Sequence, residues 1–451
     1  MSFWTLDKIA VALGDGARSG HPRGPVELAG IRTDSRSIAP GELFVALVGE
    51  NFDAHDFMDE AVAKGARAVV VSRDLEVDPG VPVFVVPDTL VALGQLASHW
   101  RRAWGGAVVM VAGSNGKTTT KDLIRAALSR AMNVHATTGN LNNRIGVPLT
   151  LLAIRAEAEI AIVEAGTNLP GEVSILRVIA DPDISVVTSV AEEHLEGLGD
   201  LEGVLREEAA AFDGVRIAIA PSSQPEIVEA AEERAVEVVT AGLDEGDVKP
   251  NEWSIAPDGV GSLRFGDVEI KPPLRGVHNL RNAMLAIAVA RSCGVSDELA
   301  AAGIAAMPAP KMRVAWEQLG RATLINDAYN ANPGSTHAAI EIVKGLGPGR
   351  QRVIVLGTMR ELGEASARCH DDATRLALES GADIIAGIGD FADSLSRIAA
   401  DDGRTIRAAS VDELWPLLQP RIEPDAVILL KASRGVRLEQ LVPHLTTWAN
   451  P

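Results

Sequence analysis

The chain has 451 residues, of which 47% are hydrophobic and 23% are charged, a composition typical of globular proteins. At about 150 residues per domain this length is too great for one core and suggests three domains. Acidic residues (61) outnumber basic ones (42), and the formal charge of -19 argues against broad binding of nucleic acids or anionic membranes.

The two cysteines, Cys293 and Cys369, are too few and too far apart for a disulfide framework or a thiolate metal site, which fits a reducing compartment. The first twenty residues have no basic leader and no uninterrupted apolar stretch. We therefore expect neither a signal peptide nor a membrane anchor, and a cytoplasmic location.

Residues 1–103 have the pattern of a small α/β domain. Short strand-like runs, LFVAL from Leu43 and ARAVVVS from Ala66, flank the helical pattern HDFMDEAVAKGA. We predict an N-terminal domain over these residues.

A glycine-rich loop follows the apolar run that begins at Val108. It reads GSNGKT from Gly113 to Thr118, a short variant of the phosphate-binding loop, because Val111 stands where the longer pattern has its first glycine. A buried strand before the loop and a helix over 121–131 would direct backbone N–H groups at an anion. Lys117 would face the outer phosphates, and the Thr118 hydroxyl would bind magnesium. The alternative is a Gly-Ser turn that only caps the helix.

From Gly105 the apolar runs lengthen, as in AVVMVA, IAIVEAG, ISVVTSV and RIAIAP, and each precedes a loop or helical stretch. This alternation is typical of a parallel sheet with helices on both faces. Glu164 and His194 follow two of these runs, at the edge where α/β sheets bind ligands. We interpret Glu164 as a metal ligand rather than a solvated strand-end residue. For His194 a ligand and an ordinary packed or surface histidine both remain open.

A further polar group opens the helical segment that begins after Gly276. His278, Asn279 and Asn282 lie in its first turns, where asparagines usually cap a helix. Asn282 lies one helical step inside, where a purely structural helix would favour Ala or Leu, so an amide that contacts a base is the alternative.

Two prolines near Lys311 end an Ala-rich helix and predict a domain boundary, with a middle domain over 104–311 and a C-terminal domain over 312–451. The runs RVIVLG, DIIAGIG and AVILLKAS predict a second doubly wound, Rossmann-like sheet in the C-terminal part. There a polar cluster follows a strand, and turn chemistry at Pro333 explains only part of it. The cluster consists of Asp327, Tyr329, Asn330 and Asn332.

Together these segments resemble the Mur ligases, the ATP-dependent amino-acid and peptide ligases of peptidoglycan synthesis. The likeness covers nearly the whole chain and is carried by TDSRSIAPGELFVAL, GSNGKTTTK, TTGNLNNRIGVPLTLL, HLEGLGDLEGV, GVHNLRNA, DAYNANP, LGTMRELGE and KASR. YNANP and ELGE resemble the members that add D-alanyl-D-alanine to UDP-N-acetylmuramoyl-tripeptide. The resemblance implies three α/β domains: a small N-terminal one for the UDP-sugar, a central P-loop ATPase with a mostly parallel sheet, and a Rossmann-like C-terminal one.

The resemblance also implies roles for individual residues. ATP would contact Gly113, Ser114, Asn115, Gly116, Lys117, Thr118, Thr119, Asn282, Arg313 and Asp327, of which Asn282 meets adenine and Asp327 the ribose. Magnesium would be held by Thr118, Glu164 and His194. The UDP-peptide and the peptide junction would involve Ser35, Arg36, Asn140, Asn143, Tyr329, Asn330, Asn332 and Ser433.

The sequence departs from the family at Glu208. Most relatives have a carbamylated lysine fourteen residues after the metal-binding histidine, and an ungapped count from His194 reaches Glu208. We hypothesise that Glu208 replaces the carbamate as a metal ligand, and the alternative is a solvated helix glutamate. Smaller departures are Arg144 and Asn326, which stand in place of acids, and Ala432, which replaces the glycine of KGSR.

Other functions remain open. The chain could be another Mur-type ligase that adds a single amino acid, or a regulator that binds muropeptides with reduced turnover. A folylpolyglutamate synthase is less consistent, because that enzyme begins directly with its ATPase. We expect a monomer.

Overall fold

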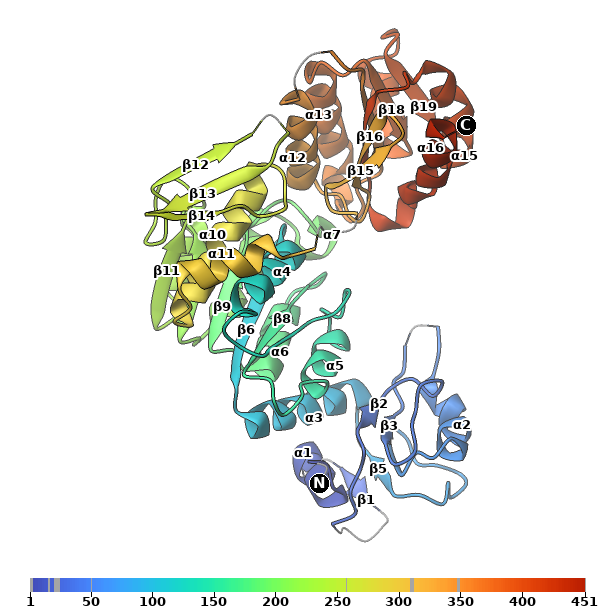
Figure 1. Ribbon diagram of the computed structural model, residues 1–451. Coiled ribbons are helices and arrows are strands. Elements are labelled where there is room, and N and C mark those ends of the chain that lie inside the picture. The colour runs from blue at the N-terminus through green and yellow to red at the C-terminus, as the bar shows by residue number, and fades with distance from the viewer. Residues whose placement is uncertain are drawn as a thin grey trace. The chain divides into compact units, whose positions relative to one another are not determined.

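The structure, a computed structural model, describes residues 3–14, 17–19, 25–49, 51–256, 258–308, 312–346 and 349–450. Its contacts divide the chain into two compact units. The first comprises Met1–Met110, His135–Ala165 and Ser174–Pro182, and the second comprises Val111–Val134, Gly166–Val173 and Asp183–Pro451. Helices pack on parallel or mixed sheets (Figure 1), which confirms the predicted α/β class. Among the described residues, none of the helices combines the length and the apolar character that spanning a membrane would require.

The first unit contains a five-stranded sheet in the order β1-β5-β4-β3-β2. Its strands are β1 Arg18–Ser19, β2 Ile31–Arg32, β3 Leu43–Val45, β4 Ala68–Val71 and β5 Val83–Val85. All neighbours are parallel except β1 and β5. β3 and β4 coincide with the two predicted strands, and η2 Ala54–Phe57 with α2 Met58–Ala63 lie between them as predicted.

Alternate residues of β3 and β4 face opposite sides of this sheet, because side chains along a strand have a period of two. Leu43 and Val45 pack with α1 Leu6–Leu13 and α3 Thr89–Trp104, whereas Phe44 packs toward α2. The unit also contains β7 Val134–Ala136, α5 Gly146–Leu152, β8 Ile160–Glu164 and most of α6 Glu172–Ala180.

In the second unit β9 Ile184–Val187, β10 Ile217–Pro221 and β11 Glu237–Ala241 form parallel neighbours. The chain passes from the first unit to the second within β6, Ala107–Ala112, which precedes α4, Lys117–Leu128. The Ala-rich α10, Val277–Ser292, packs on α4. Further helices are α7 Leu195–Leu198, α8 Leu201–Ala209, η3 Ala210–Phe212, α9 Pro225–Glu232 and α11 Asp297–Ala305. An antiparallel sheet of β12 Glu252–Ile255, β13 Gly261–Phe265 and β14 Val268–Ile270 was not predicted, because its strands are short and largely polar.

The C-terminal lobe, residues 312–450, also belongs to the second unit. Its sheet has the order β15-β16-β20-β17-β18-β19, and only β15 runs antiparallel to its neighbour. The strands are β15 Ala315–Leu319, β16 Ala322–Asp327, β17 Arg352–Gly357, β18 Ile384–Ile388, β19 Thr405–Ala408 and β20 Val427–Lys431. The predicted second doubly wound sheet is therefore confirmed at β17, β18 and β20.

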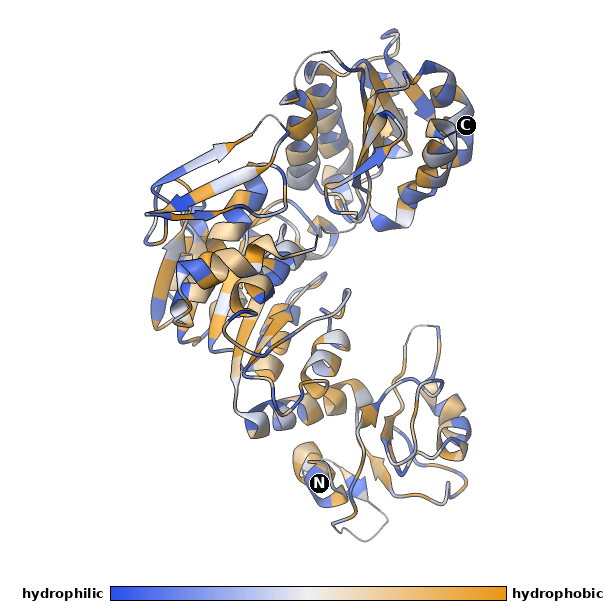
Figure 2. Ribbon diagram, viewed as in Figure 1, coloured by the Kyte–Doolittle hydropathy of each residue, from blue (hydrophilic) through white to orange (hydrophobic). Residues whose placement is uncertain are grey.

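Helices cover both faces of this sheet (Figure 1), and Figure 2 shows its strands as largely hydrophobic. α12 Pro333–Lys344, α13 Ser366–Glu379 and α14 Asp390–Ile398 pack on one face, and α15 Val411–Leu418 with α16 Leu441–Ala449 pack on the other. Short helices η4 Gly363–Ala365, η5 Gln419–Arg421, η6 Arg434–Val436 and η7 Leu438–Gln440 complete the lobe. The methyl group of Ala432 is fully buried in its core. Lys311, the predicted domain boundary, lies outside the described residues.

Candidate functional site

The phosphate loop joins β6 to α4 and needs both of its glycines. Gly113 and Gly116 have φ values of 115° and 84°, a region that side chains disfavour. A Cβ on Gly113 would lie 2.7 Å from the Thr188 backbone nitrogen. Gly116 is the N-cap of α4 and carries no side chain that could cap the first-turn N–H groups. The start of α4 therefore has no side-chain cap, an arrangement that suits the binding of an anion at a helix N-terminus.

Other loop residues are fastened to the segment after β9. Ser114 N–H donates to the Ser189 carbonyl at 2.7 Å, and its hydroxyl accepts from Ala191 N–H at 2.9 Å. Asn115 N–H donates to the Ser189 hydroxyl at 3.0 Å. Thr118 and Thr119 are half-buried in the first turn of α4. These hydrogen bonds fix Ser114 and Asn115 against the segment that follows β9.

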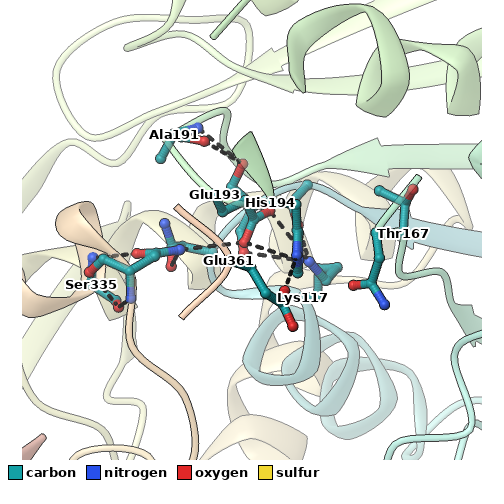
Figure 3. Close-up of polar contacts among 12 residues, drawn as sticks. Lys117, Thr167, Ala191, Glu193, His194, Ser335 and Glu361 are labelled. Carbon is teal, nitrogen blue, oxygen red and sulfur yellow. Dashed lines mark hydrogen bonds and ion pairs between the residues drawn. The ribbon is translucent and has the colours of Figure 1, made fainter. Parts of the chain in front are cut away.

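Lys117 curls back over the loop. Its ammonium group donates to the Gly113 carbonyl and to the Ser114 carbonyl, the latter at 3.4 Å. Glu193 Oε1 lies 3.9 Å from the same nitrogen (Figure 3). Glu193 is only 4% exposed, and its Oε1 has no hydrogen-bond partner. The sequence analysis missed this buried carboxylate beside the loop lysine, although the EEH tripeptide places it next to His194.

Glu208 is fully buried, which shows that the alternative of a solvated helix glutamate is wrong. Its Oε2 accepts a hydrogen bond from Gly113 N–H at 2.6 Å, and its Oε1 has no hydrogen-bond partner. Burial raises the pKa of Glu208 from 4.5 to about 7, with Glu193 adding to the rise while Lys117 and the Gly113 N–H oppose it. The helix period explains the burial, because α8 turns this side chain toward the loop and leaves Glu202 in solvent.

His194 lies between Glu193 and the C-terminal lobe, which excludes an ordinary surface position. Its Nδ1 is hydrogen-bonded to Glu361 Oε2, and its Nε2 lies 3.8 Å from Glu193 Oε2 (Figure 3). Burial alone would lower the pKa of His194, but the hydrogen bond to Glu361 and the two carboxylate charges raise it above the ordinary value. The same hydrogen bond lowers the pKa of Glu361.

Asn332 joins the C-terminal lobe to the phosphate loop. Its Oδ1 caps α12 by accepting from Ser335 N–H at 2.8 Å, as the turn signal predicts. Its Nδ2 donates to Asn115 Oδ1 at 2.9 Å and to Glu193 Oε2 at 3.3 Å. One amide thus serves both the cap and the site.

A cavity of about 170 Å³ lies at this junction. It gathers four of the predicted site residues, and it adds arginines and acids that the sequence analysis did not assign. The lining residues are Glu193, His194, Asn330, Ala331, Asn332, Arg360, Glu361, Ser433, Arg434 and Gly435. Ser433 is buried within this wall, where its hydroxyl accepts from Arg360 N–H at 3.0 Å.

The polar residues of α10 and β16 form a second group. Asp327 makes a buried ion pair with Lys431 at 2.8 Å and accepts from Val314 N–H at 3.1 Å. Burial lowers the pKa of His278 to about 4, an effect that Lys431 increases and Asp327 opposes. The Arg313 guanidinium stacks 4.2 Å from the centre of the Tyr329 ring.

Asn279 and Asn282 are both buried, and the N-cap of α10 is Gly276. Asn282 Nδ2 donates to Asn279 Oδ1 at 3.2 Å, and Asn279 Nδ2 donates to the Arg275 carbonyl at 2.8 Å. A Cβ on Gly116 would lie 2.6 Å from Asn282 Oδ1, so this amide packs against the phosphate loop. Asn282 is not a capping residue.

The first unit holds the remaining predicted residues. Glu164 is 2% exposed, which excludes a solvated strand end, and its Oε1 accepts from Asn142 Nδ2 at 3.0 Å. Asn140 and Asn143 are exposed, and Asn143 Oδ1 accepts from Gly146 N–H at the start of α5. Asn142, which the analysis missed, is the neighbour that contacts the acid.

Ser35 and Arg36 lie elsewhere in the first unit. The Ser35 hydroxyl donates to Glu60 Oε2 at 3.1 Å, and the guanidinium of Arg36 pairs with Asp34 at 2.8 Å. Within the part of the chain that the structure describes, no three His, Cys, Asp or Glu side chains are grouped closely enough to form a ready-made metal site.

Comparison with known proteins places this arrangement in a family. Successive parts of the chain match the Mur ligase family, catalytic domain (residues 27–101), the Mur ligase middle domain (111–290) and the Mur ligase, glutamate ligase domain (312–434). UDP-N-acetylmuramoyl-tripeptide--D-alanyl-D-alanine ligases from Escherichia coli (strain K12) and Bacillus subtilis (strain 168) are 35% and 34% identical. The alignments cover 93% of this chain and 94% of the first relative, and 92% and 93% for the second.

Solved structures agree. MurF from Acinetobacter baumannii superposes with a TM-score of 0.90 at 30% identity, covering 98% of this chain and 99% of that one. MurF ligase from Thermotoga maritima in complex with ADP gives 0.83 at 25% identity, with 94% and 98% covered. These likenesses confirm the three-domain fold that the motifs implied. The chain belongs to the Mur ligase family.

Proposed function

We propose that this chain is an ATP-dependent ligase that joins D-alanyl-D-alanine to UDP-N-acetylmuramoyl-tripeptide in cytoplasmic peptidoglycan synthesis. The names of its relatives support this proposal, and the observation that carries it is the cavity beside Lys117. Its wall includes Glu193, which lies 3.9 Å from the loop lysine Lys117, and two arginines, Arg360 and Arg434, whose charge suits the carboxylate of an incoming dipeptide.

The proposed chemistry begins by activating an inert carboxylate. The terminal carboxylate of the UDP-tripeptide takes the γ-phosphoryl group of ATP, and an acyl phosphate forms as ADP leaves. Lys117 and the N-terminal end of α4 neutralise charge on the phosphoryl oxygens during transfer. The dipeptide amine then attacks the acyl carbon and expels phosphate. Contacts between the C-terminal lobe and the loop exclude water, which would otherwise hydrolyse the acyl phosphate.

We propose magnesium as the accompanying cation. Two buried carboxylate oxygens without a hydrogen-bond partner, Glu208 Oε1 and Glu193 Oε1, support a cation here, because magnesium prefers oxygen ligands. Magnesium would supply charge neutralisation at the β- and γ-phosphates. We assign its ligands to Thr118, Glu164, His194 and Glu208, with Glu208 in the place of the family's carbamylated lysine.

The remaining assignments are part of the same proposal. Arg313, Asp327 and Asn282 bind the nucleotide, Ser35 and Arg36 bind the UDP group, and the predicted domains span 1–103, 104–311 and 312–451. The asparagines Asn140 and Asn143 contact the muramoyl-peptide, whereas Tyr329, Asn330, Asn332 and Ser433 lie near the peptide junction. We propose that the active protein is a monomer.

One experiment separates this function from its alternatives. UDP-muramoyl-peptides of different lengths are crossed with single amino acids and dipeptides, and products are identified by mass while phosphate release is recorded. We expect release that requires both UDP-tripeptide and D-alanyl-D-alanine. A product with a single amino acid would identify another Mur-type ligase, and substrate binding without phosphate release would identify a regulator.

A further inference from the structure

Two strained residues meet at the junction of the C-terminal lobe and the segment after β9. His194 has a φ of 49° and Glu361 a φ of 66°, values that residues other than glycine rarely adopt. Such conformations persist where the surrounding structure holds them, and they gather at functional sites. Here the two strained backbones present their side chains to each other, as Nδ1 of His194 bonds Oε2 of Glu361 (Figure 3).

The backbone reinforces this contact. Glu196 N–H donates to the Glu361 carbonyl at 3.3 Å, and a Cβ on Gly363 would lie 3.4 Å from Glu196 Cα. Nearby, Arg368 of α13 pairs with Glu192 at 2.6 Å. The contact between Glu361 and His194 is therefore one of several between the two segments, and the backbone hydrogen bond and the Arg368–Glu192 ion pair support it.

The two ring nitrogens of His194 face different partners. Nδ1 is occupied by Glu361, whereas Nε2 lies on the side of Glu193, whose other oxygen is 3.9 Å from Lys117 Nζ. A carboxylate that accepts from Nδ1–H fixes the neutral ring in the tautomer whose Nε2 carries the lone pair. The orientation of the His194 ring at the phosphate loop therefore depends on Glu361, a residue of the C-terminal lobe.

We propose that Glu361 is a positioning residue that holds the imidazole of His194 with Nε2 turned toward the phosphate loop. The inference rests on the proposed ligase function, in which His194 acts at the phosphates. Contact with the C-terminal lobe thereby orients a side chain of the nucleotide site. His194 is held in this orientation only while that lobe is in contact with the segment after β9. An ordinary exposed ion pair is the competing explanation, because half of the Glu361 side chain (52%) is exposed and such pairs contribute little.

The test compares two variants of Glu361 and one control variant at Glu364 in the full chain. Glu361→Gly removes the carboxylate and also relieves the positive φ, so it should fold at least as well as the parent. Glu361→Gln keeps an oxygen that can accept from Nδ1–H and should retain part of the effect. Glu364→Gln is the matched control, because Glu364 is exposed and loses the same charge three residues away.

The first measurement is independent of catalysis. Ring nitrogens are observed by NMR in protein labelled with ¹⁵N-histidine, at an alkaline pH where the imidazole is neutral despite the raised pKa of His194. The His194 signals are assigned by their loss in His194→Gln. We expect the parent and Glu364→Gln to show Nδ1 protonated, and Glu361→Gly to show a mixture of tautomers. An unchanged His194 signal in Glu361→Gly would overturn the proposal.

The second measurement is steady-state ligation. Loss of an orienting partner typically reduces activity about 10- to 100-fold, and we expect this in kcat for Glu361→Gly with little change in KM for ATP. Glu361→Gln should lie between Glu361→Gly and the parent, and the melting temperature of Glu361→Gly should be unchanged or higher. Equal kcat in Glu361→Gly and Glu364→Gln would refute a positioning role. If the parent itself shows no ligation, the proposed function fails, while the NMR result still decides whether Glu361 orients His194.

Discussion

The buried carboxyl group of Glu208 leads to a prediction about the stability of the ligand-free protein. Glu208 is fully buried, and its pKa rises from 4.5 to about 7 on folding. The folded protein therefore keeps the Glu208 proton at pH values where the unfolded chain has already lost it. Stability is lost as pH rises from 4.5 through 7, and the loss is complete above that range.

The magnitude follows from the two pKa values. A pKa difference of one unit corresponds to about 1.4 kcal/mol, so the folded state has lost about 1 kcal/mol of its low-pH stability at pH 5 and about 3 kcal/mol at pH 8. Glu208→Gln removes this dependence and keeps an oxygen for the Gly113 N–H. Relative to the parent, the variant should gain about 2 kcal/mol between pH 5 and pH 8, which corresponds to roughly 4–8 °C in the transition of a domain of this size.

Scanning calorimetry of both proteins at pH 5, 6, 7 and 8, without nucleotide, measures this difference. Glu202→Gln is the control, because it removes an exposed carboxylate from the same helix and should shift stability by less than about 0.5 kcal/mol at every pH. If the difference in melting temperature between Glu208→Gln and the parent stayed constant from pH 5 to pH 8, the reasoning would be refuted. With magnesium and ADP present, the parent should be stabilised more than Glu208→Gln if Glu208 is a metal ligand.

Three further changes test the phosphate loop and the group around β16. Gly116→Ala places a Cβ 2.6 Å from Asn282 Oδ1 at a φ of 84°. The affinity for nucleotide, measured by titration calorimetry, should therefore fall at least tenfold. Unchanged affinity would show that the loop tolerates a side chain. His278 is half-buried and has a pKa of about 4. Lowering the pH from 6.5 to 5 should therefore destabilise the parent by about 1–2 kcal/mol in denaturant titrations. His278→Gln should remove part of this acid sensitivity. Lys431→Met leaves Asp327 buried without its cation, and the free energy of unfolding measured by the same method should fall by about 3 kcal/mol. The double variant Lys431→Met with Asp327→Asn should recover most of this loss.

Local sequence patterns were sufficient for the α/β class, the phosphate loop and most strands of the C-terminal sheet. Apolar runs such as 108–112 can only be buried, and a glycine-lysine-threonine loop between strand and helix has few other uses. The same patterns located Glu164 and His194, because residues at the carboxyl ends of parallel strands are recognisable without coordinates.

Burial and pairing across long sequence separations were decided only by the tertiary structure. Glu202 and Glu208 look alike in the sequence, and the packing of α8 alone makes one exposed and the other completely buried. Glu361 meets His194 across 167 positions in the chain, a distance over which no local pattern carries information. Sequence periodicity specifies which face of an element is apolar, but which polar groups share a low-dielectric site depends on how the elements pack.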